Sequence, residues 1–355
     1  MKYRVVQWST GNVGYHALRA IIEHPDLDLV GVQAHSPSKI GKDAAELCGL
    51  ARSTGVRATG ALEEILALQA DCVCYTAKGE TRLKHTLSDL EKLLASGKNV
   101  VSTAPIYLVY PPHADAAMRG RLEEACRRGG TSLFVSGVDP GFSGDLLPLA
   151  GLSICERVDS VRVQELFDYS TYHDPEFTGV SFGFGQPLSY RPPLAIPGVL
   201  RMGWGGMVRM LAHAVGIELA EIRESFERRL AEESFETKMM RVEKGTTAAV
   251  RFLVEGMVDG RPVLVAEHVN RLHPDIAPDW PMPPPGRSVH RVVIEGSPSV
   301  TLDCALRGYD GDHNTGGVTA TAMRVVNAIP AVCAAQPGLL STLDLPFTPT
   351  RRVAR

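Results

Sequence analysis

The stretch VVQWSTGNVG (residues 5–14) decides the fold that this sequence predicts. It carries an apolar run into a turn of small residues, and apolar residues at helical spacing follow over residues 15–23. A dinucleotide-binding turn needs small residues at three positions, for the tight turn, for the approach of phosphate, and for close packing of helix on strand. Ser9, Gly11 and Gly14 occupy them. We therefore predict a dinucleotide site, in which Ser9 permits the tight turn if its backbone stays outside the left-handed region that glycine favours.

The rest of the first half predicts a Rossmann-like domain. Short apolar runs alternate with segments of helical spacing. The predicted strands are residues 3–8, 27–33, 71–75, 99–102 and 133–136, and the predicted helices are residues 15–23, 61–68, 83–95 and 113–128. Strands that are apolar throughout and alternate with helices are typical of a parallel sheet covered on both faces.

The loop after the second strand indicates which nucleotide binds. An acidic side chain at this point would bind the ribose diol of NAD(H) and repel the 2′-phosphate of NADP(H). The chain has no acid there and offers the polar groups of His35, Ser36 and Lys39 instead. Because donors and a cation suit a phosphate dianion, we predict NADP(H), with NAD(H) possible. The alternative is a solvated polar loop.

The predicted cofactor site lies on the loops that follow the parallel strands and on the turn that opens the second half. Its residues are Ser9, Thr10, Gly11, Asn12, Val13, His35, Ser36, Lys39, Thr76, Ala77, Thr103, Ala104 and Asp139.

The second half has the pattern of an α+β domain with an open mixed sheet. Asp259-Gly260 lies between two strand-like segments, and a two-residue connection of this kind is a strong hairpin signal. The predicted elements are a strand at residues 158–166, hairpins of residues 248–258 with 262–270 and of 290–295 with 300–306, and helices at 198–215 and 219–232. The two helices are expected to cover one face of the sheet. A last helical segment, residues 317–335, is apolar on nearly every side and should be kinked or shortened by Pro330.

The composition favours a cytoplasmic protein with a small-molecule substrate. The chain has 355 residues and a net charge of -3, which gives no electrostatic reason to expect nucleic acid or an anionic membrane as partner. No secretory signal and no run of about 18 apolar residues is visible. The seven cysteines are scattered, and Cys72 and Cys74 are best interpreted as core residues. No cysteine and histidine spacing resembles a zinc site, so we predict no metal.

Five segments in order resemble a single family. They are residues 7–14, residues 34–36 with Lys39, residues 137–142, residues 168–172 and residues 319–330. They are similar to proteins with a dihydrodipicolinate-reductase-like nucleotide domain and a carboxyl domain of the 2,4-diaminopentanoate dehydrogenase type, the group that includes the native amine dehydrogenases. The resemblance spans nearly the whole chain.

This resemblance implies the domain organisation and the class of reaction. We expect a Rossmann domain at residues 1–140, a substrate and dimerisation domain at 141–312, and a helix at 313–355 that returns to the nucleotide domain. It implies a homodimer with nicotinamide in a cleft between the domains, and hydride transfer to or from a carbonyl, imine or amine carbon of a small, mostly apolar substrate. The alternative is an NADP(H)-binding sensor or scaffold without turnover.

The resemblance also makes one departure important. Amine dehydrogenases of this family carry a glutamate shortly after the strand equivalent to residues 99–102, and this chain has no acid in residues 103–112. A buried iminium or ammonium ion needs a negative partner, so the carbonyl reaction is slightly favoured. The candidate catalytic residues are Tyr107, Tyr110, Tyr169 and His268. Each tyrosine could equally be a packing residue, and for His268 a structural role is the more common one.

Overall fold

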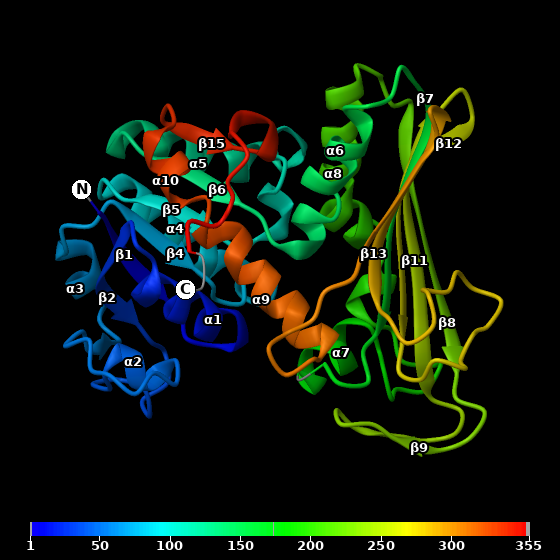
Figure 1. The fold of residues 1–355 in the computed structure, drawn as a ribbon, viewed down its shortest axis with the longest axis horizontal. Helices are drawn as coiled ribbons and strands as arrows, with labels where there is room; N and C mark the ends of the chain where they lie inside the picture. Colours follow the sequence, from blue (N-terminus) through cyan, green and yellow to red (C-terminus); the bar gives the residue numbers. More distant parts are fainter. Residues whose placement is uncertain (1, 173, 353–355) are drawn as a thin grey trace. The chain divides into compact units, whose positions relative to one another are not determined.

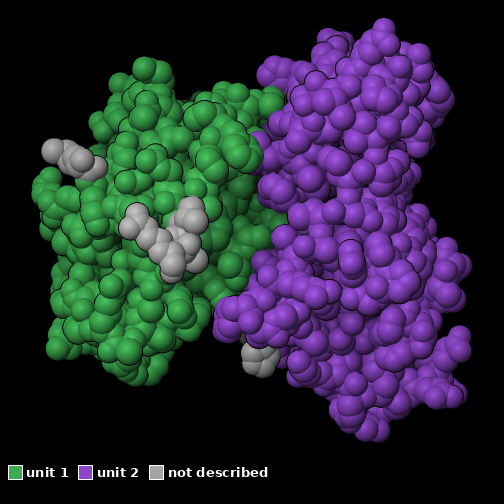
Figure 2. Space-filling model, viewed as in Figure 1, with its two compact units in different colours: residues 1–138, 318–355 green, residues 139–317 purple. Residues whose placement is uncertain are grey.

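The computed structural model describes residues 2–172 and 174–352, and the chain divides into two compact units (Figure 2). Unit 1 consists of Met1–Val138 and Val318–Arg355, and unit 2 consists of Asp139–Gly317. The end of the chain thus joins the unit that contains its beginning. The last residues of the predicted carboxyl-terminal segment, 353–355, lie outside the described residues.

Unit 1 is built on a seven-stranded parallel sheet in the order β15-β6-β5-β4-β1-β2-β3 (Figure 1). The strands are β1 Tyr3–Trp8, β2 Leu27–Gln33, β3 Ala58–Thr59, β4 Cys72–Tyr75, β5 Asn99–Ser102, β6 Ser132–Val135 and β15 Gly338–Leu340. The helices are α1 Asn12–Glu23, α2 Ala44–Leu47, α3 Leu62–Ala67, α4 Leu83–Ala95, α5 Ala116–Gly129, α9 His313–Val326, which begins in unit 2, and α10 Ile329–Ala334. The predicted Rossmann-like fold is confirmed.

The sheet of unit 1 has an apolar core on each face. Val6 packs into the cluster formed with α4 and α5, whereas its neighbour Val5 packs into the cluster formed with α1, α9 and α10. Successive strand residues point to opposite faces, so a strand covered on both sides must be apolar throughout. Cys72 and Cys74 are fully buried in the second of these clusters, with free thiols.

The stretch His313–Ala334 is the one part of the described chain that is long and apolar enough to cross a membrane by length and composition. Its residues Ala322, Val325 and Ile329 are fully buried in the core of unit 1. The stretch divides into α9 and α10, with Pro330 in the first turn of α10, as the sequence predicts. It is therefore built as a core helix.

Unit 2 holds a six-stranded mixed sheet in the order β14-β13-β7-β12-β11-β8. Its strands are β7 Arg157–Asp168, β8 Glu221–Leu230, β11 Thr247–Val258, β12 Arg261–Arg271, β13 Val289–Ser297 and β14 Val300–Cys304, with a separate pair of β9 Phe235–Glu236 and β10 Arg241–Val242. The strands β12 and β7 pair in parallel, and the other pairs in the sheet are antiparallel. Its helices are α6 Leu146–Leu152, α7 Pro175–Ser181 and α8 Val199–Val215. The two hairpins form as predicted, the first through Asp259 and Gly260 with φ of 50° and 75°.

Short 3-10 helices complete the fold. They are Glu80–Arg82, Ile106–Leu108, Pro111–His113, Pro193–Ala195 and Thr342–Asp344. The helix predicted from residue 113 begins at Ala116, because Asp115 caps it by accepting hydrogen bonds from the amides of Ala117 and Met118.

The helix predicted at residues 219–232 is wrong, because this segment is the edge strand β8. Its glutamates and arginines favour a helix locally, but Ile222, Glu224 and Phe226 alternate with more exposed residues and pair with β11. Charged side chains are common on edge strands, where they discourage pairing with another chain. Helices α6 and α8 cover the sheet instead.

Candidate functional site

The predicted nucleotide residues of unit 1 lie at one edge of its sheet. The strands β2, β1, β4 and β5 are neighbours and all run in the same direction, so their carboxyl ends meet there. The residues that follow these four strands are Ser9, Thr10, Gly11, Asn12 and Val13 after β1, His35, Ser36 and Lys39 after β2, Thr76 and Ala77 after β4, and Thr103 and Ala104 after β5. Ligands of open parallel sheets bind at such an edge.

Ser9 adopts a φ of 73°, so the turn forms although the condition that Ser9 stay outside the left-handed region is not met. Hydrogen bonds hold it there. Its amide donates to the carbonyl oxygen of Gln33 at 3.0 Å, and its carbonyl oxygen accepts from Gln7 Nε2 at 2.8 Å and from Thr76 Oγ1 at 3.3 Å. The bonds with Gln33 and Thr76 form only when the neighbouring strands are assembled, so a local pattern of residues does not indicate them.

The two glycines of the turn serve the two purposes that a dinucleotide turn requires. A Cβ atom on Gly14 would lie 2.3 Å from the carbonyl oxygen of Ser9, so helix α1 can approach the turn only with glycine at this position. A Cβ atom on Gly11 would meet nothing within 4 Å. Gly11 is the N-cap of α1 and provides no side-chain cap. The open backbone at the positive end of a 12-residue helix fits a diphosphate group.

The loop after β2 carries a cation to the same turn. Lys39 Nζ donates to the carbonyl oxygen of Thr10 at 2.6 Å, across 29 residues of sequence. The nearby hydroxyls of Ser36 and Ser38 lie 2.8 Å apart, and Ser36 is exposed. His35 Nδ1 lies 3.3 Å from Gln33 Nε2. An ammonium group and hydroxyls beside the phosphate-binding turn can accommodate a second anionic group.

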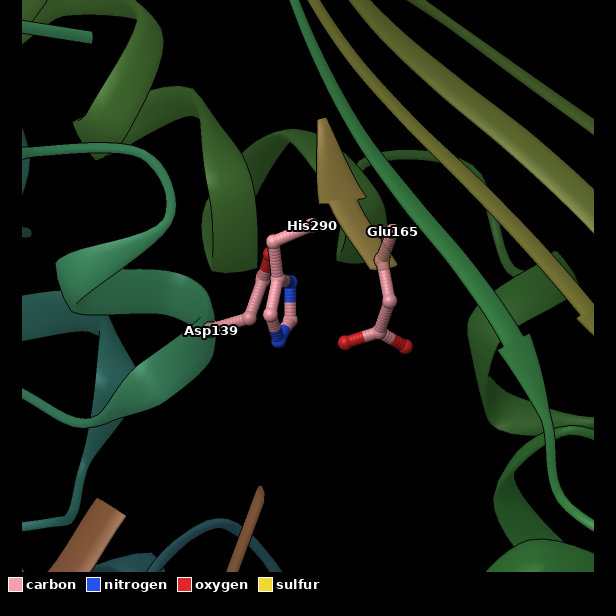
Figure 3. Close-up of side chains that lie close together, drawn as sticks. All are labelled: Asp139, Glu165 and His290. Carbon is pink, nitrogen blue, oxygen red and sulfur yellow. The ribbon is translucent and has the colours of Figure 1, made fainter. Parts of the chain in front are cut away.

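A second group of polar side chains lies on the sheet of unit 2. The register of β13, β7 and β12 puts His290, Glu165 and His268 side by side in one row across three neighbouring strands. Asp139, from the turn after β6, approaches the same row, and Figure 3 shows its side chain with those of His290 and Glu165. Three of these side chains are nearly or fully buried, with exposed fractions of 6% for Glu165, 3% for His268 and 0% for His290.

His268 lies between two carboxylates. Its Nε2 is 3.1 Å from Asp139 Oδ1 and its Nδ1 is 3.5 Å from Glu165 Oε1. Asp139 also accepts from Trp204 Nε1 at 2.7 Å and from the Ser143 hydroxyl at 2.6 Å. With three donors, the Asp139 carboxylate is fixed in place.

Burial and charge act against each other in this group. Burial by itself would lower the pKa of His268, but the carboxylates of Asp139 and Glu165 raise it to about 10. Burial would raise the pKa of each carboxyl, but the His268 charge holds both pKa values below their usual range. Burial lowers the pKa of His290. At neutral pH the group therefore holds two carboxylates, one imidazolium and one neutral imidazole.

Some polar atoms of this group have no hydrogen-bond partner among the described residues. Glu165 Oε1 accepts from the Tyr169 hydroxyl and from Asn270 Nδ2, both at 2.8 Å. In contrast, both ring nitrogens of His290 and Asn270 Oδ1 are buried without a hydrogen-bond partner in the described part of the chain. Ligand atoms of Asp139, Glu165 and His290 all lie within 4.8 Å of one another, a grouping that cysteine and histidine spacing could not reveal.

The structure brings two of the four predicted proton donors together. Tyr169 and His268 both contact Glu165 in unit 2. Tyr107 and Tyr110 belong to unit 1, where Tyr107 lies in the 3-10 helix Ile106–Leu108 and is half-buried, and Tyr110 is buried beside the next 3-10 helix. Asp139, predicted to bind the cofactor, lies in unit 2 with its carboxylate engaged as described above.

Sequence analysis missed Glu165 and His290, although a signal was present. On β7, Val161, Val163 and Glu165 share one face of the sheet, and the first two are fully or almost fully buried. Burying a glutamate on such an apolar face destabilises the folded protein unless its carboxylate is paired. His290 likewise shares a buried face with Val292. An interruption of this kind in a strand pattern marks a candidate site.

The loop of residues 103–112 contains no acid of its own, but the structure brings one to it. Glu80 Oε1 accepts a hydrogen bond from the amide of Ile106 at 2.8 Å. Glu80 is the first residue of a short 3-10 helix that follows β4. The strand β4 is the neighbour of β5, which precedes the loop of residues 103–112. A carboxyl group, whose pKa is raised by burial, therefore lies beside this loop, contributed by a segment that is distant in sequence.

Known proteins resemble the chain over its full length. Residues 142–352 match the sequence profile of the 2,4-diaminopentanoate dehydrogenase C-terminal domain. The chain is 44% identical over 347 residues to an amine dehydrogenase of Streptomyces virginiae, which covers 97% of this chain and 96% of that protein. It is 23% identical to 2,4-diaminopentanoate dehydrogenase of Acetoanaerobium sticklandii over 291 residues, 81% of this chain and 77% of the other. The structure of an amine dehydrogenase from Mycobacterium smegmatis matches with a TM-score of 0.79 at 20% identity, covering 99% of this chain and 98% of the other.

Proposed function

The chain belongs to the 2,4-diaminopentanoate dehydrogenase family and is an NAD(P)-dependent oxidoreductase, and from this we propose that it transfers hydride between NADP(H) and the nitrogen-bearing carbon of a small, mostly apolar amine. The bound nicotinamide would supply or accept the hydride. The observation that carries the cofactor proposal is the open backbone of Gly11 at the start of α1, with Lys39 beside the same turn.

Three observations favour an amine over a carbonyl substrate. The relative that is 44% identical is named an amine dehydrogenase. Glu80 supplies a carboxylate to the loop in which the sequence showed none. The buried group of unit 2 contains two carboxylates and one imidazolium, and so it carries a net negative charge that suits a cationic substrate.

Comparing substrates decides between the amine reaction and its alternatives. Purified protein is given NADPH and a panel of small ketones and aldehydes, with and without ammonium chloride, and NADP⁺ with the matching amines. We expect NADPH oxidation that requires ammonium, and NADP⁺ reduction by the amines. Turnover that is independent of ammonium would show a carbonyl reductase. Tight NADPH binding without any turnover would show a sensor or scaffold.

The choice of NADP(H) over NAD(H) rests on Lys39. Titration of NADPH and NADH against intrinsic fluorescence should show tighter binding of NADPH. Lys39→Ala should weaken NADPH binding by roughly tenfold or more and leave NADH nearly unchanged, because a charged hydrogen bond contributes about 1.5–3 kcal/mol. Lys42→Ala is the matched control, since Lys42 pairs with Glu46 at the surface. Equal affinities of the protein for the two nucleotides would overturn the preference.

We propose that one of four side chains donates the proton in the reaction. These are Tyr107, Tyr110, Tyr169 and His268. Each tyrosine is changed to phenylalanine, which keeps the ring and removes only the hydroxyl, and kcat is measured as a function of pH. If Tyr107→Phe and Tyr110→Phe both keep full kcat, neither residue is the acid, and Tyr169, which is bonded to Glu165, is the next to consider.

The assembly and location are proposed from the family resemblance. We propose a cytoplasmic homodimer without a nucleic-acid or membrane partner. Light scattering on the full chain should give twice the 38.3 kDa mass of one chain. A monomer at micromolar concentration would refute the dimer.

A further inference from the structure

We infer that Glu165, His290 and Asn270 form a binding site in unit 2 for the protonated primary amino group of the substrate. This inference rests on the proposed function and adds to it the chemical class of the group that is bound and the residues that bind it. It is carried by the charge of the buried group, by its unpaired acceptors and by its surroundings.

The buried group lacks one positive charge. Asp139 and Glu165 are ionised, His268 is an imidazolium, and burial keeps His290 neutral, so the four side chains carry a net charge of minus one. Removing an unbalanced charge from water is costly unless a partner of opposite charge accompanies it. Asp139 already has His268, Trp204 and Ser143 as partners, so the missing cation belongs beside Glu165.

The unpaired atoms beside Glu165 include two acceptors, Asn270 Oδ1 and the unprotonated ring nitrogen of His290. Among the described residues, the two hydrogen bonds that Glu165 receives are both on Oε1, so Oε2 remains for a ligand. The His290 ring is fully buried, has no partner for either nitrogen within the described residues, and in Figure 3 lies beside the Glu165 carboxylate. Asn270 Oδ1 is also buried without a partner in the part of the chain that is described. A carboxylate oxygen, a neutral imidazole nitrogen and an amide oxygen match the three N–H donors of a primary ammonium group.

Other ligands fit this site less well. A divalent metal ion could use the same three side chains, Asp139, Glu165 and His290, but the His268 imidazolium lies 3.1 Å from Asp139 and would repel it. Magnesium and calcium also prefer oxygen ligands to imidazole. A carbonyl oxygen offers no donor to the acceptor atoms of Glu165, His290 and Asn270. A single positive charge with several N–H donors balances the charge and pairs with these three acceptors.

Aromatic rings next to this group suit an apolar substituent on the amine. Tyr169 stacks on Tyr172 with ring centroids 5.2 Å apart, and the Phe182 ring is 5.7 Å from Tyr169. The Phe167 ring lies 4.7 Å from the His290 ring. Aromatic faces also attract a nearby ammonium ion. We therefore infer a small aliphatic primary amine as the ligand class.

The test measures binding of isopropylammonium chloride to the full chain by calorimetry and by the shift of the thermal unfolding midpoint, with tetramethylammonium chloride as a cation that has no N–H donor. We expect isopropylammonium to bind and raise the midpoint, and tetramethylammonium to do neither. Glu165→Gln should weaken the binding by roughly tenfold or more, because it removes the charge and keeps the shape. His290→Leu removes the nitrogens without breaking a hydrogen bond within the described residues, and should also weaken it.

Glu267→Gln is the matched control. Glu267 is equally buried and lies on the neighbouring strand β12, but it is already paired with Arg162 and Arg251. Isopropylammonium should bind this variant as it binds the wild type. Wild-type affinity in both Glu165→Gln and His290→Leu, or a midpoint raised by zinc chloride and not by isopropylammonium, would overturn the inference.

Failure of this inference can be told from failure of the proposed function. The residues proposed to hold the diphosphate and the ribose phosphate belong to unit 1, and none of the three variants changes a predicted cofactor residue, so all three should bind NADPH with wild-type affinity. If the wild type turns over amines but Glu165→Gln keeps its KM, the amino group binds elsewhere. If isopropylammonium binds but no substrate is turned over, the site stands and the reaction does not.

Discussion

His268→Gln should strongly destabilise the protein at neutral pH. In the folded protein the pKa of His268 rises from 6.5 to about 10, which corresponds to about 5 kcal/mol of favourable interaction for its charged form. About 4 kcal/mol of this remains at pH 7, above the unfolded pKa. The glutamine would leave Asp139 and Glu165 buried without a cation, and loss of one partner of a buried pair costs about 3–5 kcal/mol.

The pH dependence of stability gives a sharper test than the size of this loss. A raised folded pKa means that the His268 contribution is complete below pH 6.5 and is lost as pH rises toward 10. The lowered pKa values of Asp139 and Glu165 act at the acid end, where their contribution is lost as pH falls. Between about pH 7.5 and 9, wild-type stability should therefore fall by nearly 1.4 kcal/mol per pH unit from His268, and His268→Gln should lack this slope.

Urea unfolding at several pH values, followed by tryptophan fluorescence, provides the measurement. The fluorescence of Trp204 reports on the buried group directly, because Trp204 donates a hydrogen bond to Asp139 and its ring centroid lies 5.0 Å from that of His268. His273→Gln is the control. His273 is half exposed beside the exposed Asp275, so this variant should stay within about 0.5 kcal/mol of wild type and keep the slope. Equal unfolding midpoints for wild type and His268→Gln at pH 7 would refute a charged His268 between two carboxylates.

Three further predictions concern unit 1. Gly14→Ala should lower stability by about 1–3 kcal/mol, because its Cβ would overlap the Ser9 carbonyl oxygen, whereas Gly11→Ala should keep the stability and weaken NADPH binding; equal urea midpoints for both variants would contradict this. Ser9→Gly should leave the urea midpoint unchanged or raise the stability by up to about 1 kcal/mol, because it removes left-handed strain, and a lower midpoint would show that the serine side chain matters more. Glu80→Gln keeps an acceptor for the Ile106 amide and should therefore keep the stability; its kcat/KM for amines should fall at least about tenfold, and an unchanged value would exclude the Glu80 charge from the reaction.

The sequence by itself determined the architecture. Apolar strands without alternation required a parallel sheet covered on both faces, and the hairpin at Asp259-Gly260 followed from residues that accept positive φ. Such features depend on residues that are close together in sequence, so a short segment is enough to predict them. The positions of Gly11 and Gly14 at the start of α1 were determined in the same way.

Only the tertiary structure decided which side chains meet. Strand register put His290, Glu165 and His268 in one row, although Glu165 is more than 100 residues away from the other two in sequence. Strand order brought Glu80 to the loop at Ile106. Pairing with β11 likewise made a strand of the charged segment Glu221–Leu230, against its helical propensity. The free energies of such contacts depend on burial and on partners that are distant in sequence, and a local pattern of residues specifies neither.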